Sequence, residues 1–439
     1  MTTRTDPSAD AGTSAPQHPR VAAVLTVVFL GVTAGVQMSD MGLQAISLSA
    51  IQQTFGVGDA AAGALQGLAG VFVGSALAVP LARFADRYSR KRVLLCLILA
   101  STAMMVLSAL APNFPLFFLG RSAAGITEFA MVPLVYSMIP DLVPERHRVA
   151  ANLLFAALVA AGASGGFYFA GALLNTAQML IPWLPQAWRS AFLMLSLAGL
   201  PLLLLGVFTV DPPRRSVASA TTPGASLWQF FTSRRQTILC FVGAAGFAVV
   251  AVQAVNHLIA LALERRFDAD PSTIGHVMGL IVMASAMGCL PVAGVLDRVL
   301  APRLGSAVRP LIMCGCTALA APVLMLLVWI QDISSAFAVI AFVLFVTSTA
   351  NALVPTMLQD LAPPGLRARS FAVWSFVVSV FGASGPLMAG LLSEWTFDGA
   401  LVSSITAVAA PVLIVSMVCA WRLSVLSLQQ QGAAWPRRT

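Results

Sequence analysis

Charged residues are scarce in this chain of 439 residues. Asp, Glu, Lys and Arg together make up only 10% of it, whereas 58% of the residues are hydrophobic and the mean hydropathy is +0.87. Many of the apolar stretches approach the roughly 20 residues that a bilayer requires, which is too long for a soluble core. The short alternating segments of a membrane β-barrel are absent. The composition therefore predicts a polytopic α-helical membrane protein.

The sequence also lacks the motifs of an enzyme or a cofactor site. All six cysteines fall inside apolar runs, and Cys314-x-Cys316 is too close for the usual metal pair, so we expect neither disulfides nor a metal site. No His-x-x-x-His, paired aspartate or Ser-His arrangement is present. A Gly-x-x-x-x-Gly-Lys-Ser/Thr motif is absent as well, which excludes a nucleotide-driven pump. We expect no enzymatic activity and no cofactor.

Lysine is almost missing, because Lys91 is the only lysine among 25 basic residues. This arginine bias is typical of a GC-rich bacterial genome. If the N-terminus lies inside, only Arg189, Arg265 and Arg266 fall outside and Arg121 lies within the membrane, so the positive-inside rule places both termini in the cytoplasm. The net charge of +8 is thus a signal of topology. We expect the basic loops to anchor to anionic lipid and not to bind nucleic acid, in the cell inner membrane.

Proline, glycine and charge divide the chain into twelve apolar segments. Their expected ranges are 21–50, 60–81, 93–111, 115–140, 149–180, 187–209, 236–263, 271–296, 309–331, 333–359, 368–395 and 398–421. We therefore predict a disordered cytoplasmic tail at 1–20, a six-helix bundle at 21–210, a cytoplasmic linker at 211–235, a second six-helix bundle at 236–422 and a cytoplasmic tail at 423–439.

The two halves of the chain repeat each other. Asp141-Leu-Val-Pro recurs as Asp360-Leu-Ala-Pro, and Gly162-Ala-Ser-Gly recurs as Gly382-Ala-Ser-Gly. Asp86-Arg87 likewise recurs as Asp297-Arg298. Two six-span halves in the same orientation are the parallel repeat of a rocker-type transporter. The small residues of spans 5 and 11 predict close helix approach.

A pair of opposite charges marks the predicted fourth span. Arg121 and Glu128 are two helical turns apart, with Gly125 between them, so they lie on one helix face. Each ionisable group at membrane depth costs about 2.5–3.5 kcal/mol, which favours a functional role. With Asp40, the pair offers two carboxylates for one guanidinium, so one carboxylate should bind a proton or a cation in some state. A purely structural ion cluster between spans 1 and 4 is the alternative.

Polar side chains lie on single faces of three further spans. The residues are Thr33, Gln37, Asp40, Gln44 and Ser47 in span 1, Gln253, Asn256 and His257 in span 7, and Thr349, Asn351 and Thr356 in span 10. Together with span 4, these faces predict a central water-filled cavity. Interhelical hydrogen bonding, worth about 0.6 kcal/mol a pair, is the alternative. His257 is either a satisfied polar residue or a proton relay. The run Glu264-Arg265-Arg266 is either a solvated cap or an outer gate.

The loop Pro80-Leu-Ala-Arg-Phe-Ala-Asp86-Arg87-Tyr-Ser-Arg-Lys-Arg92 resembles the signature loop of the major facilitator superfamily, with Ala82 and Ser89 at glycine positions and Phe84 at a leucine position. The stretch from Arg121 to Glu128 is similar to the Arg-x-x-x-Gly-x-x-Glu pattern of its spinster-like and anion:cation symporter branches. The resemblance covers about residues 20–425 and is closer to the spinster-like branch. Where those branches carry Asp-Arg in span 1, this chain has Asp40-Met41.

The resemblance implies an all-α membrane protein with twelve transmembrane helices in two pseudo-symmetric six-helix bundles, working as a secondary transporter by alternating access. Spinster-like relatives move lysolipids or sphingoid phosphates, and the symporter branch moves organic anions. We therefore expect a monomeric, proton-coupled carrier for a lipid-like or small organic anion, surrounded by membrane lipid. A multidrug-type efflux carrier and a scaffold without transport activity are the alternatives.

Specific residues are expected in each role. We assign proton coupling to Glu128 and Asp40. We assign gating to the signature-loop residues and their repeats, which are Asp86, Arg87, Asp297 and Arg298. We assign substrate binding to polar residues of the four cavity-lining spans, which are Arg121, Gln37, Gln44, Gln253, Asn256, His257 and Asn351.

The predicted topology can be tested by cysteine labelling in intact cells. Single cysteines at positions 90 and 367 should react only with membrane-permeant reagents, because both loops are expected in the cytoplasm. A cysteine near Asp268 should react with impermeant reagents. Labelling of position 90 by an impermeant reagent would reverse the orientation.

Overall fold

The computed structural model describes residues 20–71, 88–122, 131–144, 147–209, 227–363 and 366–434, and the regular elements in these ranges are all helical. Within them, nine helical stretches are long and apolar enough to cross a membrane. The stretch Pro271–Leu326 covers two of the predicted segments. Two other predicted segments, 60–81 and 115–140, extend beyond the described residues. The all-α membrane class predicted from composition is confirmed.

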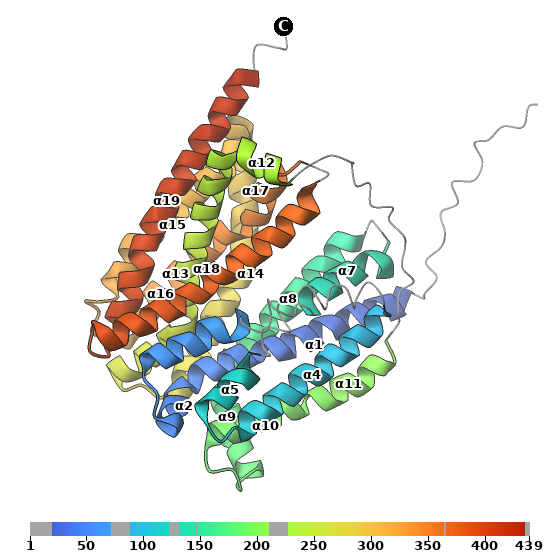
Figure 1. The fold of residues 1–439 in the computed structure, drawn as a ribbon, viewed down its shortest axis with the longest axis vertical. Helices are drawn as coiled ribbons and strands as arrows, with labels where there is room; N and C mark the ends of the chain where they lie inside the picture. The colour runs from blue at the N-terminus through green and yellow to red at the C-terminus, as the bar shows by residue number, and fades with distance from the viewer. Residues whose placement is uncertain are drawn as a thin grey trace, which may run out of the picture.

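The helices form two groups that follow the two halves of the sequence (Figure 1). The first half contains α1 (Arg20–Ile46), α2 (Leu48–Phe55), a helical stretch at 59–71, α4 (Arg90–Leu110), α5 (Phe114–Arg121), α7 (Val132–Leu142), α8 (Arg148–Tyr168), α9 (Ala170–Leu180), α10 (Ala187–Leu197) and α11 (Gly199–Val207). The second half contains α12 (Leu227–Ser233), α13 (Arg235–Phe267), α14 (Pro271–Leu304), α15 (Val308–Leu326), α16 (Ile333–Ala352), α17 (Val354–Leu361), α18 (Arg367–Trp395) and α19 (Leu401–Ala434).

Several predicted spans consist of two helices. The break between α16 and α17 coincides with Pro355 in the first turn of α17, where a proline has no N–H to donate to the preceding turn. Breaks of one residue, at Ser47 and Phe169, likewise separate α1 from α2 and α8 from α9. The short helix α12 lies inside the predicted linker, and α19 continues into the segment predicted as a tail.

Side-chain caps begin several of the helices at the membrane edge. Asn113 accepts a hydrogen bond from the backbone N–H of Leu116 at 3.0 Å, and Asp270 accepts one from Thr273 at 3.0 Å. Asp332 accepts one from Ser335 at 2.8 Å. Each cap satisfies an N–H group that the first turn of a helix leaves unpaired. The ends of these spans are therefore set locally by the sequence.

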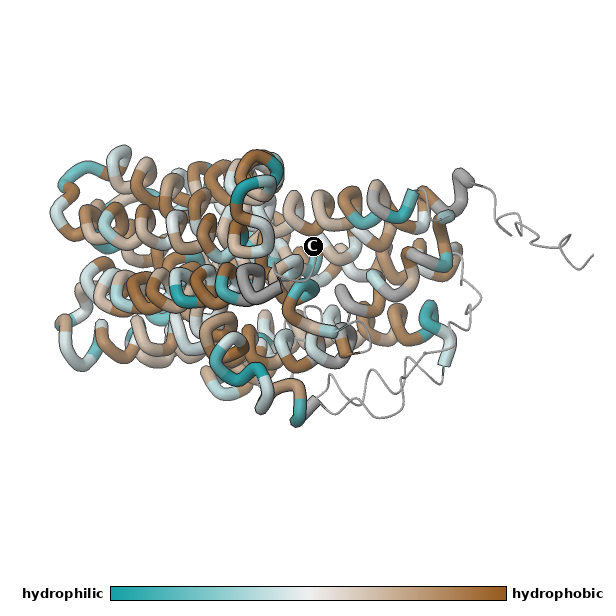
Figure 2. The backbone as a smooth tube through the Cα atoms, turned by 90° about the horizontal axis from the view of Figure 1, so that it is seen from above, coloured by the Kyte–Doolittle hydropathy of each residue, from teal (hydrophilic) through white to brown (hydrophobic). Residues whose placement is uncertain are grey.

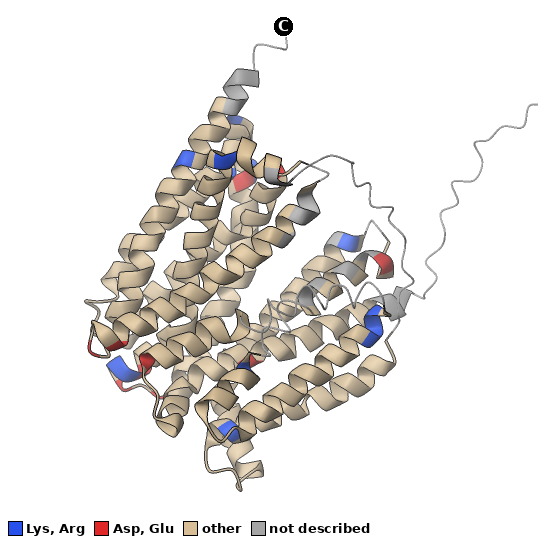
Figure 3. Ribbon diagram, in the orientation of Figure 1, with Lys and Arg blue, Asp and Glu red and all other residues tan. Residues whose placement is uncertain are grey.

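The internal repeat is reflected in equivalent ion pairs of the two halves, whose charged residues are coloured in Figure 3. Arg90, at the start of α4, lies 2.5 Å from Asp141 in α7. Arg309, at the start of α15, pairs with Asp360 in α17 and also contacts Asp297 of α14 at 3.1 Å. Arg309 and Asp360 occupy the positions of Arg90 and Asp141 in the repeat. We call this end of the molecule the Arg309 side.

Small residues bring helices together both within and between the halves. A Cβ atom on Gly162 of α8 would overlap the backbone of Gly35 in α1, and one on Gly385 of α18 would overlap the carbonyl of Val250 in α13. The close approach predicted for spans 5 and 11 is therefore confirmed, between equivalent pairs of helices in the two halves.

The two halves also contact each other through glycines that pack closely against backbone atoms. The stretch 59–71 packs against α18 so closely that Cβ atoms on Gly63 and Gly67 would overlap the carbonyls of Pro386 and Ala383. On the other side of the interface, a Cβ atom on Gly275 of α14 would overlap the carbonyl of Phe167 in α8. These contacts lie away from the Arg309 side.

Hydrophobic residues recur along the helices of both bundles (Figure 2). Large hydrophobic side chains stay exposed there, such as Leu204 at 67% and Phe208 at 85%. A soluble protein would bury such side chains, but in a bilayer they face acyl chains.

We predict that Gly67→Ala lowers the melting temperature of the purified protein, because the added methyl group meets backbone atoms of the other half. Overpacking of this kind costs about 1–3 kcal/mol. Gly315→Ala is the matched control, since a Cβ atom there meets no other atom, and it should leave the melting temperature unchanged or raise it. Equal melting temperatures for the two variants would contradict the tight contact.

Candidate functional site

A cavity of about 190 Å³ lies between the two halves. Its walls come from α1, the stretch 59–71 and α5 of the first half, and from α13 and α18 of the second half. The lining residues are Met38, Met41, Gln44, Leu65, Gln66, Gly67, Ala69, Gly70, Val71, Arg121, Val249, Gln253, His257, Val378, Ser379, Gly382 and Ala383. The cavity therefore joins apolar side chains, three amides, one imidazole, one hydroxyl and one guanidinium from both halves.

A buried ion pair stands at the wall of this cavity. Arg121 Nη1 lies 2.5 Å from Asp40 Oδ1, and the two side chains are only 3% and 4% exposed. Arg121 Nε also donates to Gln44 Oε1, one turn after Asp40 on α1, and its guanidinium lies 5.0 Å from the ring centroid of Phe192. The pair thus fastens α5 to α1 and α10 within the first half. Removing one partner of such a pair costs about 3–5 kcal/mol, because the other charge is left buried and unpaired.

Hydrogen bonds continue from this pair into the second half. Gln44 Nε2 donates to Gln66 Oε1 at 3.2 Å, and His257 Nδ1 lies 3.1 Å from the same oxygen. His257 Nε2 in turn lies 3.4 Å from Gln253 Nε2. We call Arg121, Gln44, Gln66, His257 and Gln253 the polar chain. It crosses the cavity wall from the first half to the second.

The structure brings together some of the residues predicted to bind substrate and leaves others apart. Arg121, Gln44, Gln253 and His257 line the cavity, and Asp40 lies directly behind Arg121. Three others are not part of this lining, and they are Gln37, Asn256 and Asn351. The side-chain oxygens of Asn256 and Asn351 are buried and have no hydrogen-bond partner in the described part of the chain.

The structure describes only some of the residues predicted for coupling and gating. Glu128, Asp86 and Arg87 lie outside the described residues. Asp297 accepts hydrogen bonds from Arg309 on the Arg309 side, and the neighbouring Arg298 is exposed.

Gln66 is a cavity residue that the sequence patterns did not single out. It is the one long polar side chain in the run from Ala60 to Val71, whose other members are alanine, glycine, leucine and valine. A single amide forms no periodic stripe, so the pattern of polar helix faces does not include it. Its isolation in an otherwise apolar segment was the available signal.

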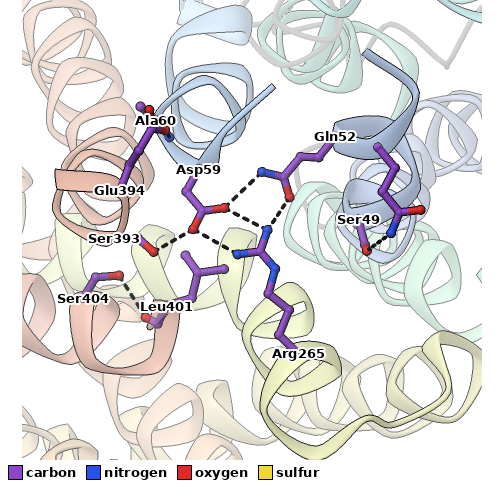
Figure 4. A network of polar contacts seen from close by, with 10 residues as sticks. Ser49, Gln52, Asp59, Ala60, Arg265, Ser393, Glu394, Leu401 and Ser404 are labelled. Carbon is purple, nitrogen blue, oxygen red and sulfur yellow. Dashed lines mark hydrogen bonds and ion pairs between the residues drawn. The ribbon is translucent and has the colours of Figure 1, made fainter. Parts of the chain in front are cut away.

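A second polar cluster joins the halves on the side opposite Arg309 (Figure 4). Arg265, in the last turn of α13, donates to Asp59 Oδ2 at 2.9 Å and to Gln52 Oε1 at 2.7 Å. Asp59 also accepts from Gln52 at 3.0 Å and from Ser393 of α18 at 2.7 Å. We call Asp59, Gln52, Arg265 and Ser393 the Asp59 network, and this end of the molecule the Asp59 side.

Glu394 adds a further link beside this network. Its Oε2 accepts a hydrogen bond from the backbone N–H of Ala60 at 2.8 Å, so a carboxylate of the second half caps a helix of the first half. A carboxylate is favoured at a helix N-terminus because of the helix dipole. The Asp59 side is therefore closed by polar contacts as well as by packed glycines.

Of the two interpretations of the Glu264-Arg265-Arg266 run, the geometry favours a gate for Arg265. Arg265 connects the halves through Asp59, whereas Arg266 donates to the carbonyls of Leu327, Val328 and Ile330 within the second half. Burial raises the pKa of Asp59, but the hydrogen bonds from Arg265, Gln52 and Ser393 outweigh it and hold that pKa below its ordinary value. Asp59 therefore stays ionised while the Asp59 side is closed.

Comparisons with known protein families and with individual proteins identify transporters. The model of the Major Facilitator Superfamily matches residues 30–386 and 259–437. An MFS-type efflux pump of Mycolicibacterium smegmatis is 26% identical over 88% of this chain and 89% of its own length. A 3-(3-hydroxy-phenyl)propionate transporter of Escherichia coli is 26% identical over 60% of this chain and 62% of its own length.

Solved structures show the same fold. The crystal structure of a bacterial homolog of the human lysosomal transporter Spinster, in an inward-facing and unoccupied conformation, has a TM-score of 0.78 at 18% identity, with 93% of this chain and 96% of that chain covered. A nucleoside transporter has a TM-score of 0.69 at 15% identity, with 91% and 99% covered.

We predict that Asp59→Asn opens the Asp59 side, because a neutral amide loses the charge of the ion pair with Arg265. Since Arg265 is partly exposed, we expect an effect of about 1 kcal/mol, or roughly fivefold in the equilibrium between closed and open states. Spin labels at the exposed positions Gln53 and Thr396 should report a longer distance in the variant.

The same labels should show a dependence on pH. The closed state lowers the pKa of Asp59, so ionised Asp59 stabilises the closed state relative to the open state. This stabilisation is complete above the ordinary aspartate pKa of about 3.9 and is lost as the pH falls through the lowered pKa. Asp332→Asn is the control, since Asp332 caps α16 without reaching the first half. Identical distances in wild type and Asp59→Asn at every pH would show that the network does not hold the halves together.

Proposed function

Since this chain belongs to the major facilitator superfamily, we propose that it is a proton-coupled secondary carrier that moves an organic anion by alternating access. It is a multi-pass membrane transporter of that family and not an enzyme. The observation that carries the proposal is the buried pair of Arg121 and Asp40 at the wall of a cavity shared by both halves. A carrier of this kind binds its substrate between the halves and exposes it to either side by rocking them.

Arg121 supplies the positive charge that an anion requires. In the state described, Asp40 neutralises it. A substrate anion can take the place of Asp40 only if that carboxylate gains a proton, because an unpaired charge at this depth is costly. Proton binding at Asp40 and anion binding at Arg121 would then occur together, which is the requirement for coupled transport.

Glu128 is proposed as the second proton site. It follows Arg121 at the helical spacing that puts both on one face, so it would share the guanidinium with Asp40. Two carboxylates around one guanidinium favour uptake of one proton.

The cavity supports a small anion or the head group of a larger one. Its volume of about 190 Å³ is below the 300–1,000 Å³ of typical ligand sites. Met38, Met41, Leu65 and Val249 give it apolar walls that suit the body of an amphipathic molecule. A lysolipid would place its chain outside this volume, whereas an aromatic carboxylate such as the one carried by the Escherichia coli relative would fit largely inside.

The orientation follows from the positive-inside rule. We propose that the Arg309 side and both termini face the cytoplasm and that the Asp59 side faces outward, in a monomer surrounded by the lipid of the inner membrane. The closed Asp59 side then corresponds to an inward-facing carrier.

Efflux of drug-like molecules is the second candidate. The Mycolicibacterium smegmatis relative, named as an efflux pump, aligns over nearly the whole chain. The two methionines of the cavity wall suit varied apolar ligands, because their side chains are flexible and polarizable. Export of neutral or cationic drugs from cells, with no uptake of anions, would favour this candidate.

Transport in proteoliposomes tests the proposal with a labelled panel of 3-phenylpropionate, other organic acids and lysolipids, with and without a pH gradient. Asp40→Asn and Glu128→Gln should abolish accumulation driven by the gradient, because each mimics the protonated carboxylate, while exchange across the membrane persists. Arg121→Ala should lose anion binding. Asp270→Asn is the control, since Asp270 caps α14 away from the cavity. Full pH-driven accumulation by both carboxylate variants would refute proton coupling at this site.

A further inference from the structure

The hydrogen bonds of the polar chain have a fixed direction. A guanidinium can only donate, so Gln44 must accept from Arg121 with its carbonyl oxygen and donate to Gln66 with its amide nitrogen. The oxygen of Gln66 is then an acceptor, and the nearby Nδ1 of His257 must carry a proton and donate to it. The other ring nitrogen, Nε2, is left to accept from Gln253. The charge of Arg121 therefore determines, through these hydrogen bonds, the tautomer of His257 in the opposite half.

This direction leaves the amide nitrogen of Gln66 without an acceptor among the described residues. Gln66 Oε1 accepts from both Gln44 and His257, whereas Gln66 Nε2 is buried and has no hydrogen-bond partner in the described part of the chain. Gln66 cannot exchange its two ends, because the nitrogen would then face two donors. Buried polar groups in proteins are almost always paired with protein or water, and Gln66 is a lining residue of the cavity, so a substrate or a water molecule there can supply the acceptor that its amide nitrogen lacks.

We propose that Gln66 determines substrate specificity by donating its free N–H group to an oxygen acceptor of the substrate. This inference rests on the proposed function of the cavity and adds to it the chemistry that the substrate must present. A carboxylate, a phosphate or a carbonyl oxygen satisfies the donor. An ammonium group does not, because it has no lone pair to accept with.

The position of Gln66 also links recognition to the movement of the halves. Its helix packs through Gly63 and Gly67 against α18, and its oxygen contacts His257 of α13. A substrate that accepts a hydrogen bond from the nitrogen of Gln66 therefore binds to a residue that also connects the two halves through His257. Asn256 and Asn351 do not share this role, since their unpaired atoms are acceptors and lie outside the cavity lining.

The first test needs no substrate. The chain has four histidines, so ¹⁵N-histidine labelling of the protein in lipid vesicles gives few signals, and His257→Gln identifies that of His257. Solid-state NMR should show His257 with its proton on Nδ1. Gln66→Met, which has a similar shape but no acceptor oxygen, should move the proton to Nε2 or produce a mixture. A wild-type His257 with its proton on Nε2 would overturn the assignment.

The second test measures binding of 3-phenylpropionate and of 3-phenylpropylamine, which share a body but differ in the presence of an oxygen acceptor. Gln66→Met should weaken 3-phenylpropionate about 10-fold, the equivalent of about 1.4 kcal/mol, and leave any binding of the amine unchanged. Gln178→Met, in α9 and away from the cavity, is the matched control. Equal affinity of the wild type and Gln66→Met for 3-phenylpropionate would overturn the proposal.

The two tests separate this inference from the function on which it rests. A wild-type protein that binds no 3-phenylpropionate or other anion of the panel would contradict the proposed substrate class. The histidine spectra would still decide whether the hydrogen bonds run in the direction that frees the amide of Gln66. Melting temperatures of Gln66→Met and Gln178→Met, compared with the wild type, show whether either variant has lost its fold.

Discussion

A guanidinium inside a hydrocarbon layer must be neutralised, and this requirement organises the centre of the molecule. Asp40 neutralises Arg121 from the neighbouring helix, and Gln44 accepts the hydrogen bond from its Nε–H. Because the guanidinium only donates, it sets the direction of every later hydrogen bond as far as Gln253. One charge thereby sets the hydrogen-bond direction of a series of neutral side chains that runs from one bundle to the other. Among the described residues, this series is the polar contact between the two bundles at the cavity wall.

The contacts around this centre differ on the two sides of the membrane. On the Arg309 side, each described ion pair lies within one half, Arg90 with Asp141 and Arg309 with Asp360. On the Asp59 side, Arg265 and Asp59 join the halves. Pairs within a half hold that half together, whereas pairs between halves would have to break if the proposed alternating access separates the halves on that side. The arrangement is that of two rigid bodies that meet on one side of a cavity.

The sequence predicted those features that either recur along the chain or carry a high energetic cost in a membrane. An apolar composition and recurring motifs predicted the all-α membrane class and the repeated halves, and the charge in an apolar span identified Arg121. The stripe on span 1 identified Gln44 and Asp40. Gln66 and Asp59 were missed, because each is a single polar residue whose meaning depends on a partner almost 200 residues or more away.

The sequence by itself determined that this chain spans the membrane and carries a charge within it, because transfer energies and helical periodicity depend only on residue type and order. Only the tertiary structure decided which carboxylate meets Arg121, which amide remains unpaired and on which side the halves close. These are properties of distances between residues remote in the chain. Glycine patterns predicted that some helices approach closely, but only the packing of glycine against backbone in the folded protein shows which helices meet and sets those distances.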